Sequence, residues 1–429
     1  MRWNIRHQVV TVASVLAMIF ICGLSRAQDS EALPRNKLVL PELIHEVLAR
    51  NPEVVTARMQ WEAATNRVTQ ARSLDDPTVS VQLWNFPQSF NVTQTQNTIL
   101  GLSQSFPFPG KLALKGDVAS RSAEMTEQAV RGKEREIVAR LKQAYYDLFL
   151  AQKAIQIHHE QVELIRQSVE ITTARFRTGK GTQTDVLKAQ IELSILFEQL
   201  PVLEQRRESA EAMVNTLLDR GPSEPLGLAQ EPSQLPLEKS LDDLHRLAQN
   251  DRPELKAAEL AVQRNEQSRA LAERQYYPDF NVAVQRFQNF QANDGFGAYV
   301  AMSVPFAFWT KPKYDAGVQE AAAAVSAARA QHHSLENLTR FQIKDLLAKL
   351  RASDQVATLY RTTILPQAEQ SLNAAQVGYR AGKGGFPDLL ETQRALRGFQ
   401  LEYFKALVDR QHRLAELEQI VGITLDRQS

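Results

Sequence analysis

Two adjacent histidine pairs, His158-His159 and His332-His333, are the first side chains in this sequence of 429 residues that could carry chemistry. Imidazole nitrogens bind transition metals, but the ligands must converge on one ion. Adjacent residues on a helix point about 100° apart, so neither pair can chelate from a single face. We therefore expect no metal site, and we interpret His158 as a packed side chain of a helix interface.

Two Gly-Lys dipeptides invite comparison with phosphate-binding loops. Such a loop has another glycine five residues before the Gly-Lys and a Ser or Thr directly after it. Neither Gly179-Lys180-Gly181 nor Gly110-Lys111 meets these conditions. We predict no cofactor and no catalytic residue, and we interpret the glycines of the two turns described next as helix stops in the left-handed conformation.

Acidic residues follow two similar glycine turns. The turns are Phe176-x-x-Gly179-Lys180-Gly181 and Tyr379-x-x-Gly382-Lys383-Gly384. A carboxylate at a helix start accepts backbone N–H groups and stabilises the positive end of the helix dipole, so Asp185 and Asp388 can each begin the following helix. Glu391 lies one turn beyond Asp388 on the same face. In the first turn Lys188 takes the corresponding place.

The two turns belong to an internal repeat. Pro52 recurs as Pro253 after 201 residues, and Gly179 recurs as Gly382 after 203. Such self-similarity indicates one structural unit used twice. The predicted repeats span residues 28–220 and 241–422, with a Pro- and Gly-containing linker at 221–240 and a C-terminal tail at 423–429.

Each repeat is predicted to contain a helix, two strands, a very long helix and a further helix. In the first repeat these are a helix from Pro41 to about Ser73, strands within 78–106, a long helix over 113–178 and a helix over 183–219; in the second they are a helix from 241, strands within 280–306, a long helix over 314–379 and a helix over 387–421. Apolar residues at steps of four and three predict that the first long helix is a rod of roughly 100 Å. In the second, the apolar pattern shifts by one residue near Pro366, which predicts a local kink.

Aromatic residues gather around the four predicted strands. Of 31 aromatic residues, 16 lie in the windows 80–109 and 276–314, which favours transmembrane β-strands with aromatic girdles, although a soluble β-subdomain fits the strands equally well. Four strands cannot close a barrel, so a membrane barrel would need strands from several chains. The predicted membrane-interface aromatics are Trp84, Phe86, Phe106, Phe108, Phe287, Phe296, Phe306, Phe308 and Trp309.

The first 27 residues are predicted to be a secretory signal peptide. Arg2 and Arg6 precede an apolar run of 16 residues, and Ser25-Arg26-Ala27 gives a small-x-small cleavage site. A membrane anchor and a lipoprotein acylated at Cys22 are the alternatives. Cleavage lowers the formal charge from +1 to −2, and this near balance argues against a nucleic-acid partner.

At the level of motifs, the sequence resembles the TolC-like outer membrane efflux family over essentially the whole mature chain. The resemblance rests on the repeat, on Asn51-Pro52-Glu53, on Gly101-Leu102-Ser103-Gln104 running into Phe106–Lys111, and on the two glycine turns. It implies a fold that is mainly α with a β-barrel part. It also implies a homotrimer in the outer membrane of a Gram-negative bacterium, in which each chain adds four strands to a twelve-stranded barrel in outer membrane lipid. The long helices would form a shared tunnel across the periplasm.

The resemblance further implies a passive exit duct. Asp388 and Glu391 match acidic positions that line the closed end of the tunnel, where three chains would form a ring of carboxylates that favours cations. The family's tip arginine is here Gly384. A periplasmic adaptor would dock at the tips, and an inner-membrane pump of the resistance-nodulation-division type would supply the energy. The predicted docking positions are Gly179, Lys180, Gly181, Gly382, Lys383 and Gly384.

Two alternatives remain open from the sequence. A soluble periplasmic coiled-coil scaffold or adaptor would share the signal peptide and the heptads but would lack membrane strands. An outer membrane channel for type I protein secretion would share the whole architecture. The proline-rich segment Phe106–Lys111 resembles the heavy-metal efflux branch more than the protein-secretion branch.

Overall fold

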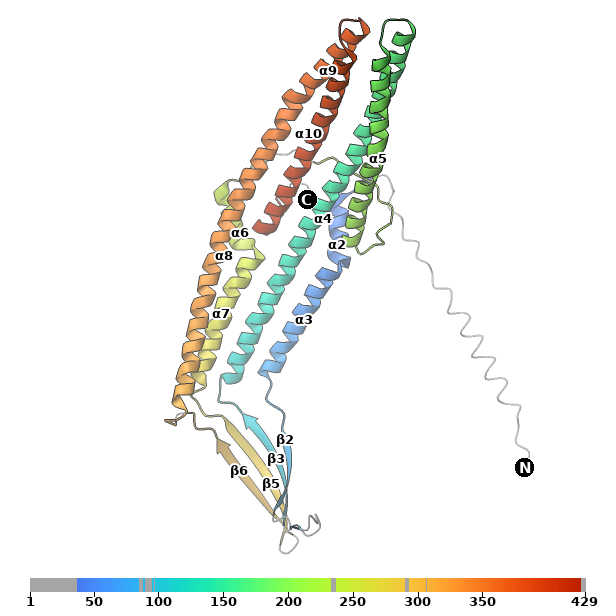
Figure 1. Ribbon diagram of the computed structural model, residues 1–429. Helices are drawn as coiled ribbons and strands as arrows, with labels where there is room; N and C mark the ends of the chain where they lie inside the picture. Colours follow the sequence, from blue (N-terminus) through green and yellow to red (C-terminus); the bar gives the residue numbers. More distant parts are fainter. Residues whose placement is uncertain are drawn as a thin grey trace, which may run out of the picture.

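The computed structural model describes residues 37–84, 88, 95, 97–232, 237–289, 293–305 and 307–425. The predicted signal peptide and the predicted interface residues Phe86 and Phe306 lie outside the described residues. The molecule is elongated, with two long helical hairpins at one end and a small sheet at the other (Figure 1). Within the described part of the chain, no helix combines the length and the apolar character needed to cross a membrane.

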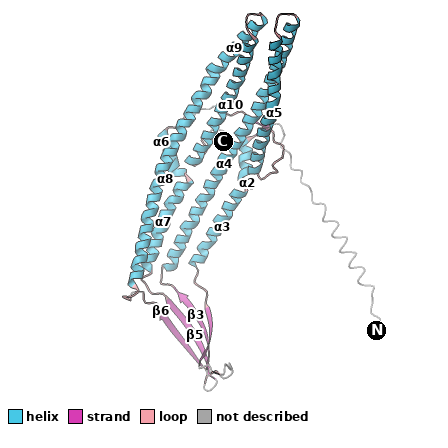
Figure 2. Cartoon of the chain, viewed as in Figure 1, coloured by secondary structure: helices cyan, strands magenta, loops and turns pink. Residues whose placement is uncertain are grey.

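The same order of elements occurs twice along the chain (Figure 2). The first half contains α2 (Leu40–Arg50), α3 (Pro52–Arg72), β2 (Thr78–Trp84), β3 (Asn97–Phe106), α4 (Lys111–Arg177) and α5 (Gln183–Leu217). The second contains α6 (Leu241–Asp251), α7 (Pro253–Arg274), β5 (Phe280–Asn289), β6 (Gly295–Met302), α8 (Lys311–Leu359), the π-helix η2 (Tyr360–Ile364), α9 (Leu365–Arg380) and α10 (Phe386–Val421). Two short parallel strands, β1 (Lys37–Leu38) and β4 (Leu228–Ala229), pair beside the middle of the molecule.

The helix predicted from Pro41 to Ser73 is two helices, so that prediction was wrong. Asn51 between them has an extended ψ of 124°, because a following proline disfavours the helical conformation. Its side-chain oxygen accepts a hydrogen bond from the backbone N–H of Glu53 at 2.9 Å and caps α3. The second half breaks in the same way at Arg252, before Pro253.

These breaks let helices from distant parts of the sequence stack end to end. The Asn51 side chain donates to the carbonyl of Leu217 at 2.8 Å, which joins the end of α5 to the start of α3. At the corresponding place in the second half, Gly422 follows α10 and lies against the backbone of Asp251, just before α7. Separate apolar cores surround the two junctions, one built around α2 and α4 and the other around α6 and α8.

The second long helix is interrupted by a π-helical turn. The turn covers Tyr360–Ile364, directly before the proline at the start of α9. A π turn closes i→i+5 hydrogen bonds and so takes up an additional residue. This turn accounts for the one-residue shift of the apolar pattern near Pro366, where a kink was predicted.

The four longer strands form one antiparallel sheet in the order β2-β3-β5-β6. Registers such as Val81 opposite Leu100 and Val282 opposite Val300 place large apolar side chains on a single face. The exposed members of this apolar face are Val79, Val81, Leu83, Leu100, Leu102, Phe106, Val282, Val284, Phe296, Val300 and Met302. The other face carries mainly small and polar residues.

The last strand is shorter than predicted. It ends at Met302 instead of Phe306, because the backbone N–H of Ser303 turns to the carbonyl of Asp279 at 3.0 Å. Pro305 then has no N–H with which to continue a ladder. The chain enters α8 through turns at 308–310.

Substitution of Gly422 by alanine should destabilise the junction of α10 with α7. Gly422 has a φ of 84°, and a Cβ there would lie 2.5 Å from the carbonyl oxygen of Asp251. We expect a loss of about 2 kcal/mol or more in the free energy of unfolding, measured by denaturant unfolding followed by circular dichroism. Gly398→Ala in the same helix is the control, since a Cβ at Gly398 meets open space. Equal effects of the two substitutions would contradict this explanation.

Candidate functional site

The two hairpin tips close with the same backbone geometry. Gly179 has a φ of 70° and Gly382 a φ of 76°, so both predicted left-handed helix stops are confirmed. The N–H of Lys180 returns to the carbonyl of Arg175 at 2.8 Å, and the N–H of Lys383 returns to that of Gly378 at 2.9 Å. These bonds satisfy carbonyls at the helix ends. The predicted docking residues Gly179–Gly181 and Gly382–Gly384 thus lie at the two tips, and both lysines are exposed.

The helices that follow the tips begin differently. At the first tip, Thr182 and Asp185 form a capping box: the Thr182 hydroxyl accepts the N–H of Asp185 at 3.2 Å, and the Asp185 carboxylate accepts the N–H of Thr182. The predicted helix start at Asp185 is confirmed. At the second tip, Gly385 occupies the cap position and has no side chain to form such a box with Asp388.

The predicted gate residues lie together on the exposed side of α10. Asp388 and Glu391 are exposed, while Leu389 and Leu390 between them are buried in the apolar core of the tips. In the described residues, no hydrogen bond or ion pair engages either carboxylate. Two acids one turn apart are therefore available to ions or to a neighbouring molecule.

Arg175 links the two tips and was missed in the sequence. Its guanidinium Nη1 donates to the carbonyls of Tyr379 at 2.6 Å and Arg380 at 3.1 Å, and Nη2 donates to the carbonyl of Lys180 at 3.0 Å. The guanidinium also lies 4.8 Å from the centre of the Tyr379 ring. Burial and the nearby Asp185 carboxylate raise the pKa of the Tyr379 hydroxyl. An arginine in the last turn of a helix is common, so its sequence position carried no signal.

A second ion pair joins the hairpins further from the tips. Arg394 of α10 donates through Nε and Nη2 to the carboxylate of Glu192 of α5, and the Glu192 side chain is only 2% exposed. Beside it, the Gln393 amide donates to the Ser168 hydroxyl at 3.2 Å. Buried charged groups are stable only when paired, so this cluster holds the two hairpins in one register.

His158 lies inside the same helical bundle. It is 3% exposed, whereas His159 is exposed, and their rings are inclined by 70°, so the two do not share a face. Burial, with the neighbouring His159 and Arg397, lowers the pKa of His158. The packed role predicted for this residue is confirmed by its burial.

The predicted membrane-interface aromatics fall into three groups. Phe106 and Phe296 belong to the apolar face of the sheet, and Phe308 and Trp309 are exposed beyond its end. Phe108 stacks on Tyr277 with ring centres 4.5 Å apart. Trp84 and Phe287 lie on the opposite, mainly polar face, where the Phe287 ring covers Gly297. Lipid contact therefore stays a prediction for the members of the apolar face and the chain beyond it.

The Phe106–Lys111 segment forms a joint between sheet and helices. Lys111 is 2% exposed, and its Nζ donates to the Tyr277 carbonyl and to the Asp279 carboxylate, each at 2.8 Å. The same carboxylate accepts the N–H of Phe108 at 2.7 Å. Burial raises the pKa of Asp279, but the bonds from Lys111 and Phe108 outweigh it, and the net pKa is lowered. The Gly110-Lys111 dipeptide is thus a structural clamp.

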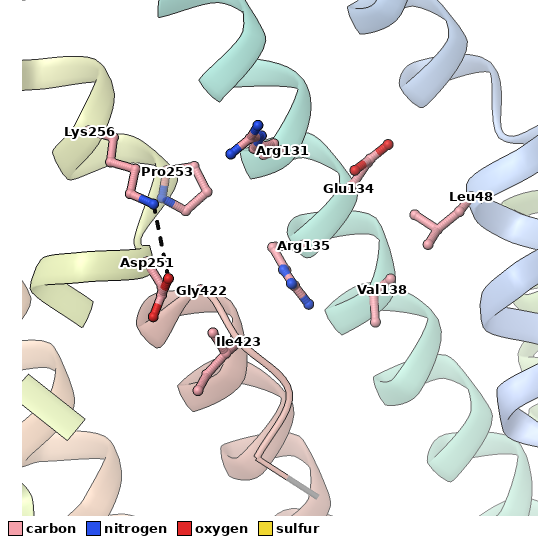
Figure 3. Close-up of a pocket in the computed structure, with 10 residues that line it drawn as sticks. All are labelled: Leu48, Arg131, Glu134, Arg135, Val138, Asp251, Pro253, Lys256, Gly422 and Ile423. Carbon is pink, nitrogen blue, oxygen red and sulfur yellow. Dashed lines mark ion pairs between the residues drawn. The ribbon is translucent and has the colours of Figure 1, made fainter. Parts of the chain in front are cut away.

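A cavity of about 310 Å³ lies between α4, α7 and the end of α10 (Figure 3). Arg131, Arg135 and Lys256 line it together with Glu134 and Asp251. These acids face cations, because Glu134 pairs with Arg58 at 2.7 Å and Asp251 lies 4.0 Å from Lys256. The cavity is a salt-bridged surface depression far from the tips (Figure 1).

A family model described as outer membrane efflux protein matches residues 43–220 and 244–423, one match in each half of the chain. The chain belongs to the outer membrane efflux protein family. The resemblance seen in the sequence is therefore confirmed. Members of this family are channels and not enzymes.

The chain is 24% identical to the cobalt-zinc-cadmium resistance protein CzcC of Cupriavidus metallidurans, over 90% of each chain. Its fold is similar to solved structures of the outer-membrane channel OprN (TM-score 0.74, 18% identity, 89% of each chain) and of VceC from Vibrio cholerae (0.74, 18%, 90% of this chain and 97% of VceC). CusC is similar too, with a TM-score of 0.75 at 17% identity over 90% of this chain and 92% of CusC. The predicted fold class is confirmed: the chain is mostly helical and has the efflux-channel fold.

Acid should weaken the hairpin bundle through His158. Its pKa is lower in the folded state, so the unfolded chain binds the proton more readily and stability is lost as pH falls below about 6.5. Thermal unfolding between pH 7.5 and 5.5 should therefore show less acid sensitivity in His158→Gln than in the unsubstituted protein.

His412 provides a control of opposite sign. Burial disfavours its charge, but hydrogen bonds with Asp147 and the Gln143 carbonyl outweigh this and raise its pKa. Its stabilising contribution is complete below about 6.5 and is lost as pH rises through the folded value, so His412→Gln should increase the acid sensitivity. Identical pH profiles for all three proteins would contradict both assignments.

Proposed function

We propose that this protein is the outer membrane exit duct of a tripartite efflux system. It conducts substrates passively from a periplasmic adaptor and an inner-membrane pump to the exterior, and it opens at the periplasmic hairpin tips. Family membership supports the channel over a soluble scaffold. The observation that carries the proposal is the sheet, which has one exposed apolar face and two open edges.

The open edges require further chains. In lipid, every backbone N–H and carbonyl must find a partner within protein, since each unsatisfied group costs several kcal/mol. β2 and β6 are the edge strands of this sheet. Three copies joined β6 to β2 close a twelve-stranded barrel, whose apolar face contacts lipid and whose mainly polar face lines water. Joining copies in this way also places the three sets of helices around one axis.

The tips are the proposed gate and docking site. Exposed carboxylates of Asp388 and Glu391, repeated by three chains, form a ring that attracts cations at the closed end. Lys180 and Lys383 lie at the tip surface, where an adaptor can bind them. The pump is proposed to be of the resistance-nodulation-division type.

Divalent metal ions are the proposed substrates. Support comes from the relative named for cobalt, zinc and cadmium resistance, and from the acidic pair at the tip. A duct for small drugs or for secreted proteins would share the same architecture. Uptake and export of radioactive zinc in cells with and without the gene, beside an export assay for a dye, separates the first two.

Lipid contact of the apolar face can be tested with neighbouring residues of one strand. Val284 lies on the apolar face and Gln285 on the other. A lysine on the lipid side costs about 2–4 kcal/mol at mid-membrane, so Val284→Lys should reduce the heat-modifiable trimer in outer membrane fractions several-fold. Gln285→Lys, which faces water, should assemble normally. Equal assembly of both variants, or a monomer released without detergent, would favour the soluble scaffold.

Neutralising the gate should change conduction. Asp388→Asn with Glu391→Gln removes the proposed carboxylate ring, so single-channel conductance in planar bilayers should rise and block by divalent cations should weaken. Glu402→Gln is the control, since Glu402 is an exposed acid of the same helix about three turns further along. If the double variant is blocked as strongly as the control, the gate lies elsewhere.

A further inference from the structure

We infer that Arg175 is a positioning residue that fastens the two hairpins of one protomer into a single unit, so that opening of the duct separates protomers from each other and leaves each hairpin pair intact. The inference rests on the proposed gated trimer. Nothing in the repeat or the tip motifs assigned a role to this arginine.

Arg175 binds where a cation is most effective. It extends from the last turn of α4 to the carbonyls of Tyr379 and Arg380 at the end of α9, the negative pole of that helix. The same guanidinium holds the Lys180 carbonyl of its own turn and lies over the Tyr379 ring. One side chain therefore ties both tips together through three hydrogen bonds and a ring contact.

The rest of the bundle strengthens this attachment. The Glu192–Arg394 pair joins α5 to α10, and the Gln393–Ser168 bond joins α10 to α4. A shared apolar core continues between them, with Ile165 and Leu196 from the first hairpin and Phe386 from the second, all at most 1% exposed. The hairpins of one chain are thus joined by directional bonds as well as by packing (Figure 1).

The internal repeat shows what the seams between protomers lack. In a ring of alternating hairpins, each second hairpin faces the first hairpin of the next chain, as a repeat-related copy of the contact within the chain. With the tip spacing of 203 residues, Arg175 corresponds to Gly378, Glu192 to Ala395 and Arg394 to Ile191. The neutral pair alone recurs, as Gln190 and Ser371. The charged fasteners therefore cannot be repeated at the seams.

The outer faces of the hairpins carry apolar residues instead. Leu187 and Ile191 on α5 are 50% and 59% exposed, and Val377 on α9 is 67% exposed. Apolar contacts have no directional bonds, so such surfaces can slide or part more readily than the fastened pair. The easiest opening motion therefore turns each four-helix tip outward as one body.

A reversible cross-link tests this motion. Arg397 donates to Gln199 at 3.3 Å across the two hairpins, and both residues are partly exposed. Gln199→Cys with Arg397→Cys, bridged by a short thiol-cleavable linker, ties the hairpins of each chain together. We expect the linked protein to keep its adaptor-dependent export and its open conductance, within about twofold of the reduced protein. Loss of both on linking, with recovery on reduction, would overturn the inference.

Variants of Arg175 supply the second readout. Arg175→Ala should raise the closed-state conductance of a correctly assembled trimer at least several-fold, Arg175→Lys should raise it less, and the 199–397 cross-link should suppress the leak of Arg175→Ala. A leak that the cross-link does not reduce would show that Arg175 holds no hairpin pair. A wild-type protein without any conductance would instead refute the proposed channel, so the two failures are distinguishable.

Discussion

Backbone hydrogen bonding at the two open edges of the β2-β3-β5-β6 sheet is the constraint on which the rest of this molecule depends. The sheet is too small to close, and its apolar face is suited to lipid, where unpaired backbone groups are not tolerated. Pairing of β6 with β2 of another copy satisfies the edges. The same pairing sets the helices side by side, so the tunnel and its gated end are consequences of the sheet.

The internal repeat divides the work between halves that look alike in outline. Both halves break a helix before a proline, stack helices end to end and close a tip with a left-handed glycine. They differ in their charged residues. The first half supplies Arg175 and Glu192, whereas the second supplies Asp388 and Glu391 at its tip. A duplicated scaffold thereby gives two kinds of contact around the axis, one fastened and one free to move.

Periodicity and turn chemistry predicted most of the fold, because those signals are local. The long helices, the four strands, the left-handed glycines and the Asp185 helix start all follow from short-range patterns. The break at Asn51 could also have been predicted from Pro52. By contrast, the contact of Arg175 with Tyr379 and the pairing of Glu192 with Arg394 each join residues about 200 positions apart. No local pattern marks such a pair, and the exposed gate acids are placed by a neighbouring chain that the sequence does not describe.

Cysteine cross-linking between edge strands tests the central claim most directly. Cys22, in the predicted signal peptide, is the only cysteine of the chain, so one cysteine on β2 and one on β6 can be placed in several registers without competing thiols. The account predicts that, in intact cells, at least one register gives a covalent trimer that survives boiling in detergent and dissociates on reduction. Monomers at every register, in a protein that reaches the membrane, would contradict it.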